Sequence, residues 1–190
     1  MARELSLSQK RAGFELKSTS LMQLAYIVAQ ESKCISWKVG AIISKDERII
    51  STGYNGTPAG QVNCCDHAHD ENWTDERGHM HESCGGKHTE WSQKNEIHAE
   101  LNAILYAAKR GISIEGATMY VTVSPCADCA KAIAQSGIKQ LVYCVDYPRN
   151  PDNWTDILVR SDITVRKLDK RHLDLLNWEK ISDKLPRSDN

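Results

Sequence analysis

The sequence predicts an α/β fold, a sandwich in which about five strands form a mixed sheet with helices on both faces. Two β-rich runs, 38–44 and 48–54, are separated only by "KDE", which predicts an antiparallel hairpin. From Ala117 onward, strand-like segments alternate with helix-like segments. Because helical connections favour right-handed crossovers, the last three strands of this series are expected to run parallel.

The first helix is expected over residues 18–32, where apolar residues recur at helical spacing. Ser20 followed by Gln23 has the form of a capping box, which is typical of a helix start. Residues 1–17 are polar and charged, lack the apolar centre of a signal peptide, and are expected to form a loose N-terminal extension.

After the hairpin, the breaker cluster "NGTPAG" is followed by a segment without periodicity, from residue 61 to about residue 93. This insert is rich in cysteine and histidine, and the lack of periodicity predicts a long loop. A loop of that length in a compact domain usually has a function.

The second half of the chain supplies the remaining elements. Helices are expected over 98–111, which ends at Gly111, and over 125–137, with Pro125 in the first turn. The other predicted elements are strands at 117–123, 139–145 and 163–168, a short helix at 153–161 and a closing helix at 171–181. The chain is thus divided into the extension 1–17, one domain over 18–181 and a C-terminal tail over 182–190.

Charge and cysteine content narrow the function classes. The formal net charge is −1 and the pI about 6.6, without the basic run that binds nucleic acid or an anionic membrane. The most apolar stretch, "LMQLAYIVA", is too short to span a bilayer. Seven cysteines without an export signal favour reduced thiols over a disulfide framework. We therefore expect a cytoplasmic protein that binds neither nucleic acid nor a membrane.

The stretch "SPCADC" predicts a metal site. Cys126 and Cys129 lie at positions i and i+3 of a helix start, where the helix N-terminus lowers thiol pKa toward the metal-binding thiolate. A structural zinc and a redox pair of the CxxC kind are the alternatives. His98, at the start of the preceding helix, offers a third ligand, and three ligands with an open fourth position are typical of catalytic zinc. Glu100 is suited to proton transfer beside that metal.

The combination of H-x-E with P-C-x-x-C resembles the signature of zinc-dependent nucleobase deaminases. In such enzymes zinc lowers the pKa of water to about 7 and makes hydroxide available at neutral pH. By this resemblance, Glu100 takes the proton of the water and then delivers protons to the ring nitrogen and to the leaving ammonia.

Longer stretches, among them "SWKVGAI", "STGYNGTPAG", "VNCCD" and "NEIHAELNAIL", resemble deoxycytidylate (dCMP) deaminases, most closely the bacteriophage type. The resemblance implies a three-layer α/β/α cytidine-deaminase-like fold, a homohexamer, and hydrolysis of dCMP to dUMP and ammonia for thymidylate synthesis. It also implies activation by dCTP and inhibition by dTTP, with Mg²⁺ accompanying the effector triphosphate. A phage-encoded enzyme of this kind would work in the host-cell cytoplasm.

The same resemblance indicates residues that bind nucleotides. Asn55 lies in the "YNG" stretch that contacts nucleotide in the family, Ser124 could accept from the base amino group through its carbonyl, and Tyr147 could stack on the base. The alternatives are that Asn55 is only a turn residue, that Ser124 is only a helix cap, and that Tyr147 is an aromatic that merely packs at the rim. Residues assigned to an effector nucleotide are Tyr54, Gly56, Thr57, Tyr106 and Lys109.

The phage-type resemblance further implies a second, structural zinc, with the ligands Cys34, Cys64, His88 and Glu96. A long polar insert is not expected to build its own core, and a closed metal site is one way to fix it. Ordinary reduced cysteines and a surface histidine are the alternative. Because the insert is shorter than the family would lead us to expect, alternative ligands remain, namely His67, His69, His79, His81 and Cys84.

Two other functions are compatible with the sequence. A tRNA adenosine deaminase shares the His-type signature, but it must hold a polyanion, and a net charge of −1 fits that poorly. A non-enzymatic nucleotide-binding module could use the same fold. Such a module has no need of a carboxylate beside a three-ligand metal, so Glu100 favours the enzyme.

Overall fold

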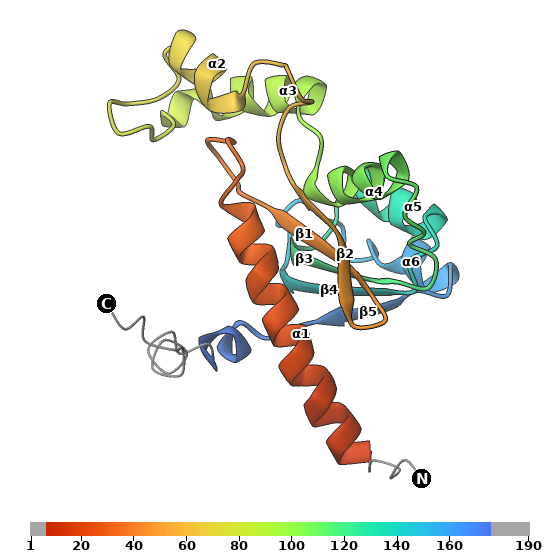
Figure 1. The fold of residues 1–190 in the computed structure, drawn as a ribbon. Coiled ribbons are helices and arrows are strands. Elements are labelled where there is room, and N and C mark those ends of the chain that lie inside the picture. The colour runs from red at the N-terminus through yellow and green to blue at the C-terminus, as the bar shows by residue number, and fades with distance from the viewer. Residues whose placement is uncertain (1–6, 176–190) are drawn as a thin grey trace, which may run out of the picture.

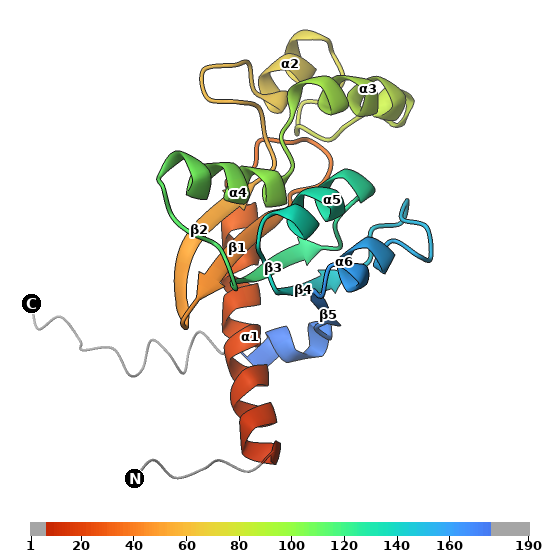
Figure 2. The same ribbon diagram turned by 90° about the vertical axis from the view of Figure 1, so that its right-hand side faces the viewer.

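The computed structural model describes residues 7–175, which form a five-stranded sheet with helices on both faces (Figures 1 and 2). The strand order is β2-β1-β3-β4-β5, with the strands Arg48–Tyr54, Gly40–Lys45, Thr118–Val123, Gln140–Val145 and Thr164–Lys167. β1 pairs antiparallel with β2 and with β3, whereas β3, β4 and β5 run parallel. The predicted hairpin, mixed sheet and parallel strands are therefore confirmed.

The helices divide between the two faces of the sheet (Figure 2). α1 (Leu7–Ala29) packs on one face, and α4 (Ala99–Lys109), α5 (Ala127–Gln135) and α6 (Asp156–Arg160) pack on the other. Because successive strand residues point to opposite faces, neighbours in one strand serve different cores. Ile42 lies in the core under α1, and Ile43 lies in the core under α4, α5 and α6.

Gly53 allows α4 to lie directly on the sheet. A Cβ atom at this position would lie 2.3 Å from the carbonyl oxygen of Ala99 and 2.4 Å from the backbone nitrogen of Ala103. No side chain fits such a gap, so only glycine permits this approach of β2 to α4. The contact fixes the first turns of α4.

The two ends of the described chain differ from the prediction. α1 begins at Leu7, so the segment expected to be a loose extension is helical from that residue, and Ser20 lies inside the helix rather than at its start. Residues 7–17 contain several good helix formers and no proline, which explains the continuation. The predicted closing helix begins as the 3-10 helix η2 (Lys170–Leu175), while its remainder and the tail 182–190 lie outside the described residues.

The insert is not the predicted loop. It contains α2 (Cys64–Asp70), the 3-10 turn η1 (Glu82–Cys84) and α3 (Gly85–Asn95). The expectation that it could not build a core is also wrong, because Ala68, Trp73 and Cys84 are buried together. Trp91 packs against this small cluster. Isolated tryptophans supply its apolar area, and they leave no regular pattern in the sequence.

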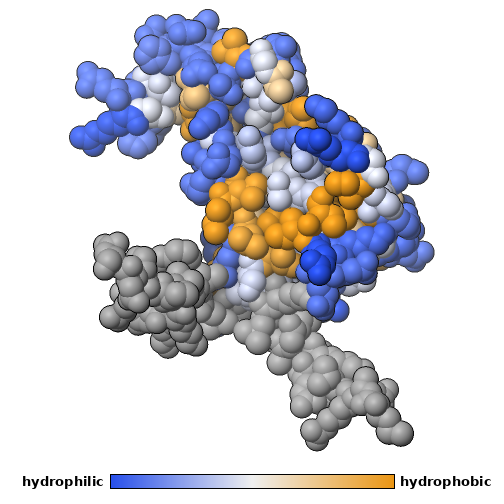
Figure 3. Space-filling view, viewed as in Figure 1, coloured by the Kyte–Doolittle hydropathy of each residue, from blue (hydrophilic) through white to orange (hydrophobic). Residues whose placement is uncertain are grey.

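Surface polarity differs between the parts of the molecule. Figure 3 shows a mainly hydrophilic insert and a band of apolar surface across the middle of the same view. Exposed apolar side chains include Leu24 and Ile27 of α1 and Ile49 of β2. Within residues 7–175, no helix combines the length and the apolar character needed to cross a membrane.

Candidate functional site

Three predicted metal ligands meet beyond the carboxyl end of β3. His98 is the N-cap of α4, Cys126 is the N-cap of α5, and Cys129 lies in the first turn of α5. The Nδ1 atom of His98 lies 3.4 Å from the sulfur of Cys126 and 3.4 Å from that of Cys129. Pro125 precedes this cap and does not occupy the first helical turn as predicted.

The pKa values in this first cluster favour a thiolate that can bind a metal. A hydrogen bond from Cys129, and a weaker influence of His98, lower the pKa of Cys126 to about 4. The Cys126 thiolate in turn raises the pKa of His98 to about 9 and, together with burial, raises the pKa of Cys129. Two sulfurs and one imidazole nitrogen lie within 4.8 Å of one another. This donor set fits zinc and leaves a fourth position open.

Glu100 lies beside the first cluster without belonging to it. Its side chain is buried, in the second residue of α4. Burial raises the pKa of this carboxyl, and the nearby Cys126 thiolate acts in the same direction. A carboxyl with a raised pKa can both take and return a proton near neutral pH.

A second cluster contains the other four predicted ligands. One ligand atom from each of Cys34, Cys64, His88 and Glu96 lies within 4.8 Å of the others, and the Cys34 sulfur is 3.4 Å from the Nε2 atom of His88. A hydrogen bond from Cys64 lowers the pKa of Cys34 to about 4. The Oε1 atom of Glu96 is buried without a hydrogen-bond partner among the described residues. An unpartnered carboxylate oxygen beside two sulfurs fits a fourth metal ligand.

The alternative ligands of the insert lie elsewhere. Among the described residues, the second cluster includes none of them. His67 lies between two tryptophan rings, His69 is 87% exposed, and His79 contacts Asp75. His81 is exposed, and Cys84 belongs to the small core of the insert.

Members of both clusters line one cavity of about 540 Å³, namely Cys34, His88 and Glu96 of the second cluster and His98 and Cys126 of the first. The two clusters are joined through a single residue, because Ile97 separates Glu96 from His98. The backbone of Ile97 pairs with that of Gly56, with N–H···O distances of 2.8 Å and 3.1 Å in the two directions. The loop after β2 therefore holds the segment that connects the two clusters.

Asn55 lines the cavity, but its side chain also holds the backbone. Its Oδ1 atom accepts a hydrogen bond from the Val39 N–H at 2.8 Å, and its Nδ2 atom donates to the Trp37 carbonyl at 2.9 Å. These bonds fix the segment that carries Trp37, a half-exposed residue at the cavity wall. Asn55 thus shapes the cavity, whatever contact it makes with a ligand.

Ser124 and Tyr147 also line the cavity. The hydroxyl oxygen of Ser124 accepts hydrogen bonds from the Tyr147 N–H at 2.8 Å and from the Asn150 side chain at 3.1 Å. Asn150 donates as well to the carbonyl of Pro125, at 2.8 Å. The ring of Tyr147 meets that of Trp37 edge to face, with centroids 6.3 Å apart.

The residues assigned to an effector separate into two groups. Tyr54, Gly56 and Thr57 line a second cavity of about 470 Å³, whose wall also includes Cys64. Tyr106 and Lys109 lie on α4 and line neither cavity, and the Tyr106 ring lies under the guanidinium of Arg110 at 5.4 Å. The structure thus distinguishes Asn55, at the first cavity, from its neighbours in the sequence.

The sequence did not single out Trp37 and Arg149, which line the cavity, or Asn150, which fixes the cavity loop to Ser124 and Pro125. Arg149 is exposed and lies on the same loop as Tyr147. A signal for Arg149 and Asn150 existed, because both lie on the loop that follows a predicted parallel strand, where ligands of α/β folds bind. Trp37 gave no such signal.

Comparison with known proteins identifies the family. The profile of the cytidine and deoxycytidylate deaminase zinc-binding region matches residues 16–145. The chain belongs to this family. A deoxycytidylate deaminase of Enterobacteria phage T4 is 54% identical, with coverage of 88% of this chain and 98% of the phage protein. ComE operon protein 2 of Bacillus subtilis is 37% identical, with coverage of 85% and 77%.

Solved structures agree with this assignment. A dCMP deaminase from the cyanophage S-TIM5, crystallised in complex with dCMP and dUMP, is 32% identical with a TM-score of 0.58. The match covers 86% of this chain and 99% of the cyanophage chain. The predicted cytidine-deaminase-like fold is confirmed, and the chain is a zinc-binding deaminase of this family.

Proposed function

We propose that this deaminase hydrolyses dCMP to dUMP and ammonia, with His98, Cys126 and Cys129 as zinc ligands and Glu100 as the proton-transfer residue. The observation that carries the proposal is the position of buried Glu100 beside a three-ligand cluster on the cavity wall. The phage T4 relative is a deoxycytidylate deaminase, and the cyanophage structure contains dCMP and dUMP. These relatives favour the reaction over tRNA deamination or ligand binding alone.

Glu100 performs the proton transfers of this reaction. Zinc at the first cluster would activate a water for attack on the ring carbon that bears the amino group. Glu100 would accept the two protons of that water in turn, the first on attack and the second from the hydroxyl that becomes the carbonyl, and pass one to the ring nitrogen and one to the departing amine. Its raised pKa, caused by burial, suits a group that must be base and then acid.

The cavity offers contacts for the rest of the nucleotide. The carbonyl of Ser124 would accept from the base amino group, Tyr147 would contact the base, and Asn55 holds the adjoining wall. Among the described residues that line this cavity, Arg149 is the only lysine or arginine, so it is the cation available to the 5′-phosphate. Asn150 supports the position of Arg149 by fixing the loop to Ser124 and Pro125.

We assign a second zinc to Cys34, Cys64, His88 and Glu96. The unpartnered Oε1 atom of Glu96 and the closeness of the four donors support this assignment. Bound there, zinc would tie the insert to the start of α4, because Glu96 lies two residues before His98. The second cluster would thereby brace the catalytic cluster.

Regulation and assembly are part of the proposal. We propose that dCTP, with Mg²⁺, activates the enzyme and that dTTP inhibits it, through the cavity lined by Tyr54, Gly56 and Thr57. Tyr106 and Lys109 would lie at subunit contacts in a homohexamer, which the exposed apolar side chains of α1 and β2 are suited to support. The reaction would take place in the cytoplasm, that of the host cell for a phage enzyme.

The test is dUMP formation from dCMP by purified, zinc-loaded protein, without effector, with dCTP and Mg²⁺, and with dTTP. Turnover that dCTP raises and dTTP suppresses is the expected result. Turnover that neither nucleotide changes would remove the regulatory part alone. An absence of turnover in every condition, with zinc content verified, would remove dCMP as the substrate.

A further inference from the structure

Two helices of the insert contribute ligands to the second cluster and also touch through a ring stack. The imidazole of His67 on α2 lies flat against the indole of Trp91 on α3, with centroids 4.6 Å apart and planes inclined by 11°. The ring of Trp73 meets His67 edge to face at 4.9 Å. His67 is therefore held between two tryptophans.

Each stacked residue lies three positions after a proposed ligand on the same helix. His67 follows Cys64 by three residues on α2, and Trp91 follows His88 by three residues on α3. Residues three apart lie on the same side of a helix. One side of α2 thus presents Cys64 and then His67, while one side of α3 presents His88 and then Trp91.

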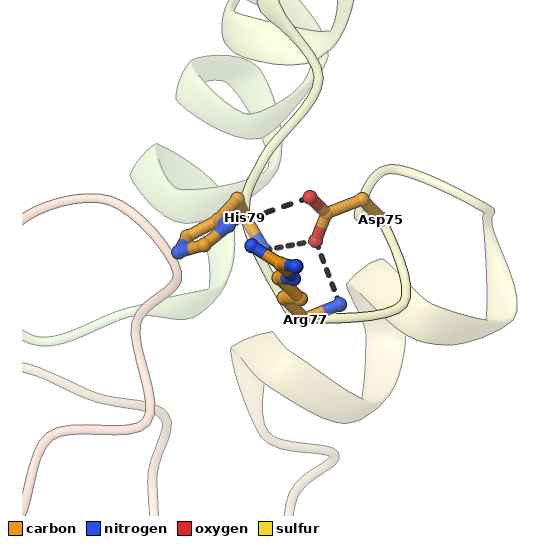
Figure 4. A network of polar contacts seen from close by, with 3 residues as sticks. All are labelled: Asp75, Arg77 and His79. Atoms are coloured by element: carbon orange, nitrogen blue, oxygen red, sulfur yellow. Dashed lines mark hydrogen bonds and ion pairs between the residues drawn. The ribbon is translucent and has the colours of Figure 1, made fainter.

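The connection between α2 and α3 is held largely by contacts within itself, such as the hydrogen bond from the His81 N–H to the Trp73 carbonyl at 2.8 Å. After α2, Trp73 returns to the insert core through a hydrogen bond from its N–H to the Ala68 carbonyl, at 2.8 Å. The chain then forms an exposed turn in which the Asp75 carboxylate accepts from the backbone N–H groups of Arg77 and His79, at 2.9 Å and 2.8 Å (Figure 4). The Asp75 contacts are local to the turn, so the small core and the ring stack are what join α2 to α3.

We propose that His67 is a positioning residue for the second metal cluster. Its stack on Trp91 sets α2 against α3 so that the Cys64 sulfur reaches the donors of Cys34, His88 and Glu96. The inference rests on the second zinc proposed above and assigns a role to a histidine that is not itself in the ligand set. Residues that orient metal ligands from outside commonly change metal affinity by roughly tenfold or more.

The experiment measures zinc directly. Zinc content per chain and the rate of zinc release to a chelator are compared in the full-length wild type, His67→Ala and His67→Phe. Two zinc ions are expected in the wild type, one for each cluster. His67→Ala should release the second zinc roughly tenfold faster or lose it, whereas His67→Phe restores the stack and should stay within about twofold of the wild type.

His69→Ala is the matched control, because His69 lies on the same helix, is 87% exposed and pairs with its neighbour Asp70. It should leave zinc content and release unchanged. Far-UV circular dichroism checks that the variants are folded, and if His67→Ala is not, Trp91→Leu replaces it with the same expectation.

The outcomes separate the two proposals. A wild type that binds two zinc ions, with His67→Ala releasing them at the wild-type rate, overturns the role of the stack alone. The same holds if His67→Phe loses zinc as fast as His67→Ala, since stacking would then not be what matters. If the wild type binds a single zinc ion, both the second zinc site and this inference are wrong. The dCMP turnover assay would still test the proposed reaction independently.

Discussion

Glu100 is a buried carboxyl with a raised pKa, two residues from one proposed zinc ligand and close to another. A buried acid that only packed would be costly to keep, because burial disfavours its charged form. Glu100→Gln keeps the shape and removes the proton transfer. We expect kcat for dCMP to fall by roughly 10³-fold, with zinc content unchanged, as measured by turnover and by metal analysis of the same preparation.

Asp156→Asn is the matched control for Glu100→Gln. Asp156 also lies in the first turn of a helix, α6, but it is exposed and is not among the described residues that line the cavity. It should retain nearly full turnover. If Glu100→Gln kept a tenth of the wild-type kcat, the proton-transfer role would have to pass to another group.

Arg149 gives a prediction about the substrate. Removing the one lysine or arginine that lines the described part of the cavity should weaken phosphate binding, so Arg149→Gln should raise KM for dCMP by about tenfold. Turnover of deoxycytidine, which has no phosphate, should not change. Arg160→Gln, on α6 outside the cavity, is the control. Equal losses on both substrates would show that Arg149 supports the loop and not the phosphate.

At the scale of the elements, the position of α4 depends on Gly53. Gly53→Ala would place a methyl group against backbone atoms of α4, which cannot move aside as a flexible side chain could. We expect a loss of about 2–3 kcal/mol in the free energy of unfolding, measured in urea. Gly86→Ala, in α3 with open space around its Cβ, should be neutral or slightly stabilising. A Gly53→Ala protein as stable as Gly86→Ala would mean that α4 can shift at no cost.

Some helices and strands were predictable from the sequence and others were not. The hairpin and the parallel strands were predictable because their apolar runs are bounded by turn residues, as at "KDE" between β1 and β2. The start of α1 was not, since Ser20 resembles a cap in sequence but lies inside a longer helix. α2 and α3 were missed because their apolar side chains are few, and contacts such as Trp73 with Ala68 join residues without a shared period.

The candidate site, too, was only partly predictable from the sequence. Spacing and resemblance predicted two sets of candidate ligands, and the structure brings the members of each within 4.8 Å of one another. The wall of the cavity could not be predicted as a whole, because Trp37 and Arg149 come from distant segments that only the fold brings together. Nor could the sequence show that Asn55 and Gly56, adjacent in the chain, face different cavities.

At the scale of the whole molecule, zinc binding would join an insert with its own small core to a sheet with two larger cores. The ligands must give up protons to do so. Without metal at pH 7, the pKa of about 9 keeps His98 protonated, and Cys129 and Cys64 have raised pKa values that keep them as thiols. Cys126, with a pKa of about 4, is already a thiolate.

Zinc uptake should therefore release protons and strengthen with pH. Protons compete with zinc for each ligand that is protonated before binding, so affinity falls as pH drops from about 9 toward 7, the window in which His98 becomes charged. Titration calorimetry at pH 7, in two buffers of different ionisation enthalpy, counts the protons. His98→Ala should release about one proton fewer than the wild type, and His69→Ala, whose exposed imidazole is outside both clusters, should release the same number. Equal counts for His98→Ala and the wild type would contradict the imidazolium–thiolate pair on which this pH dependence rests.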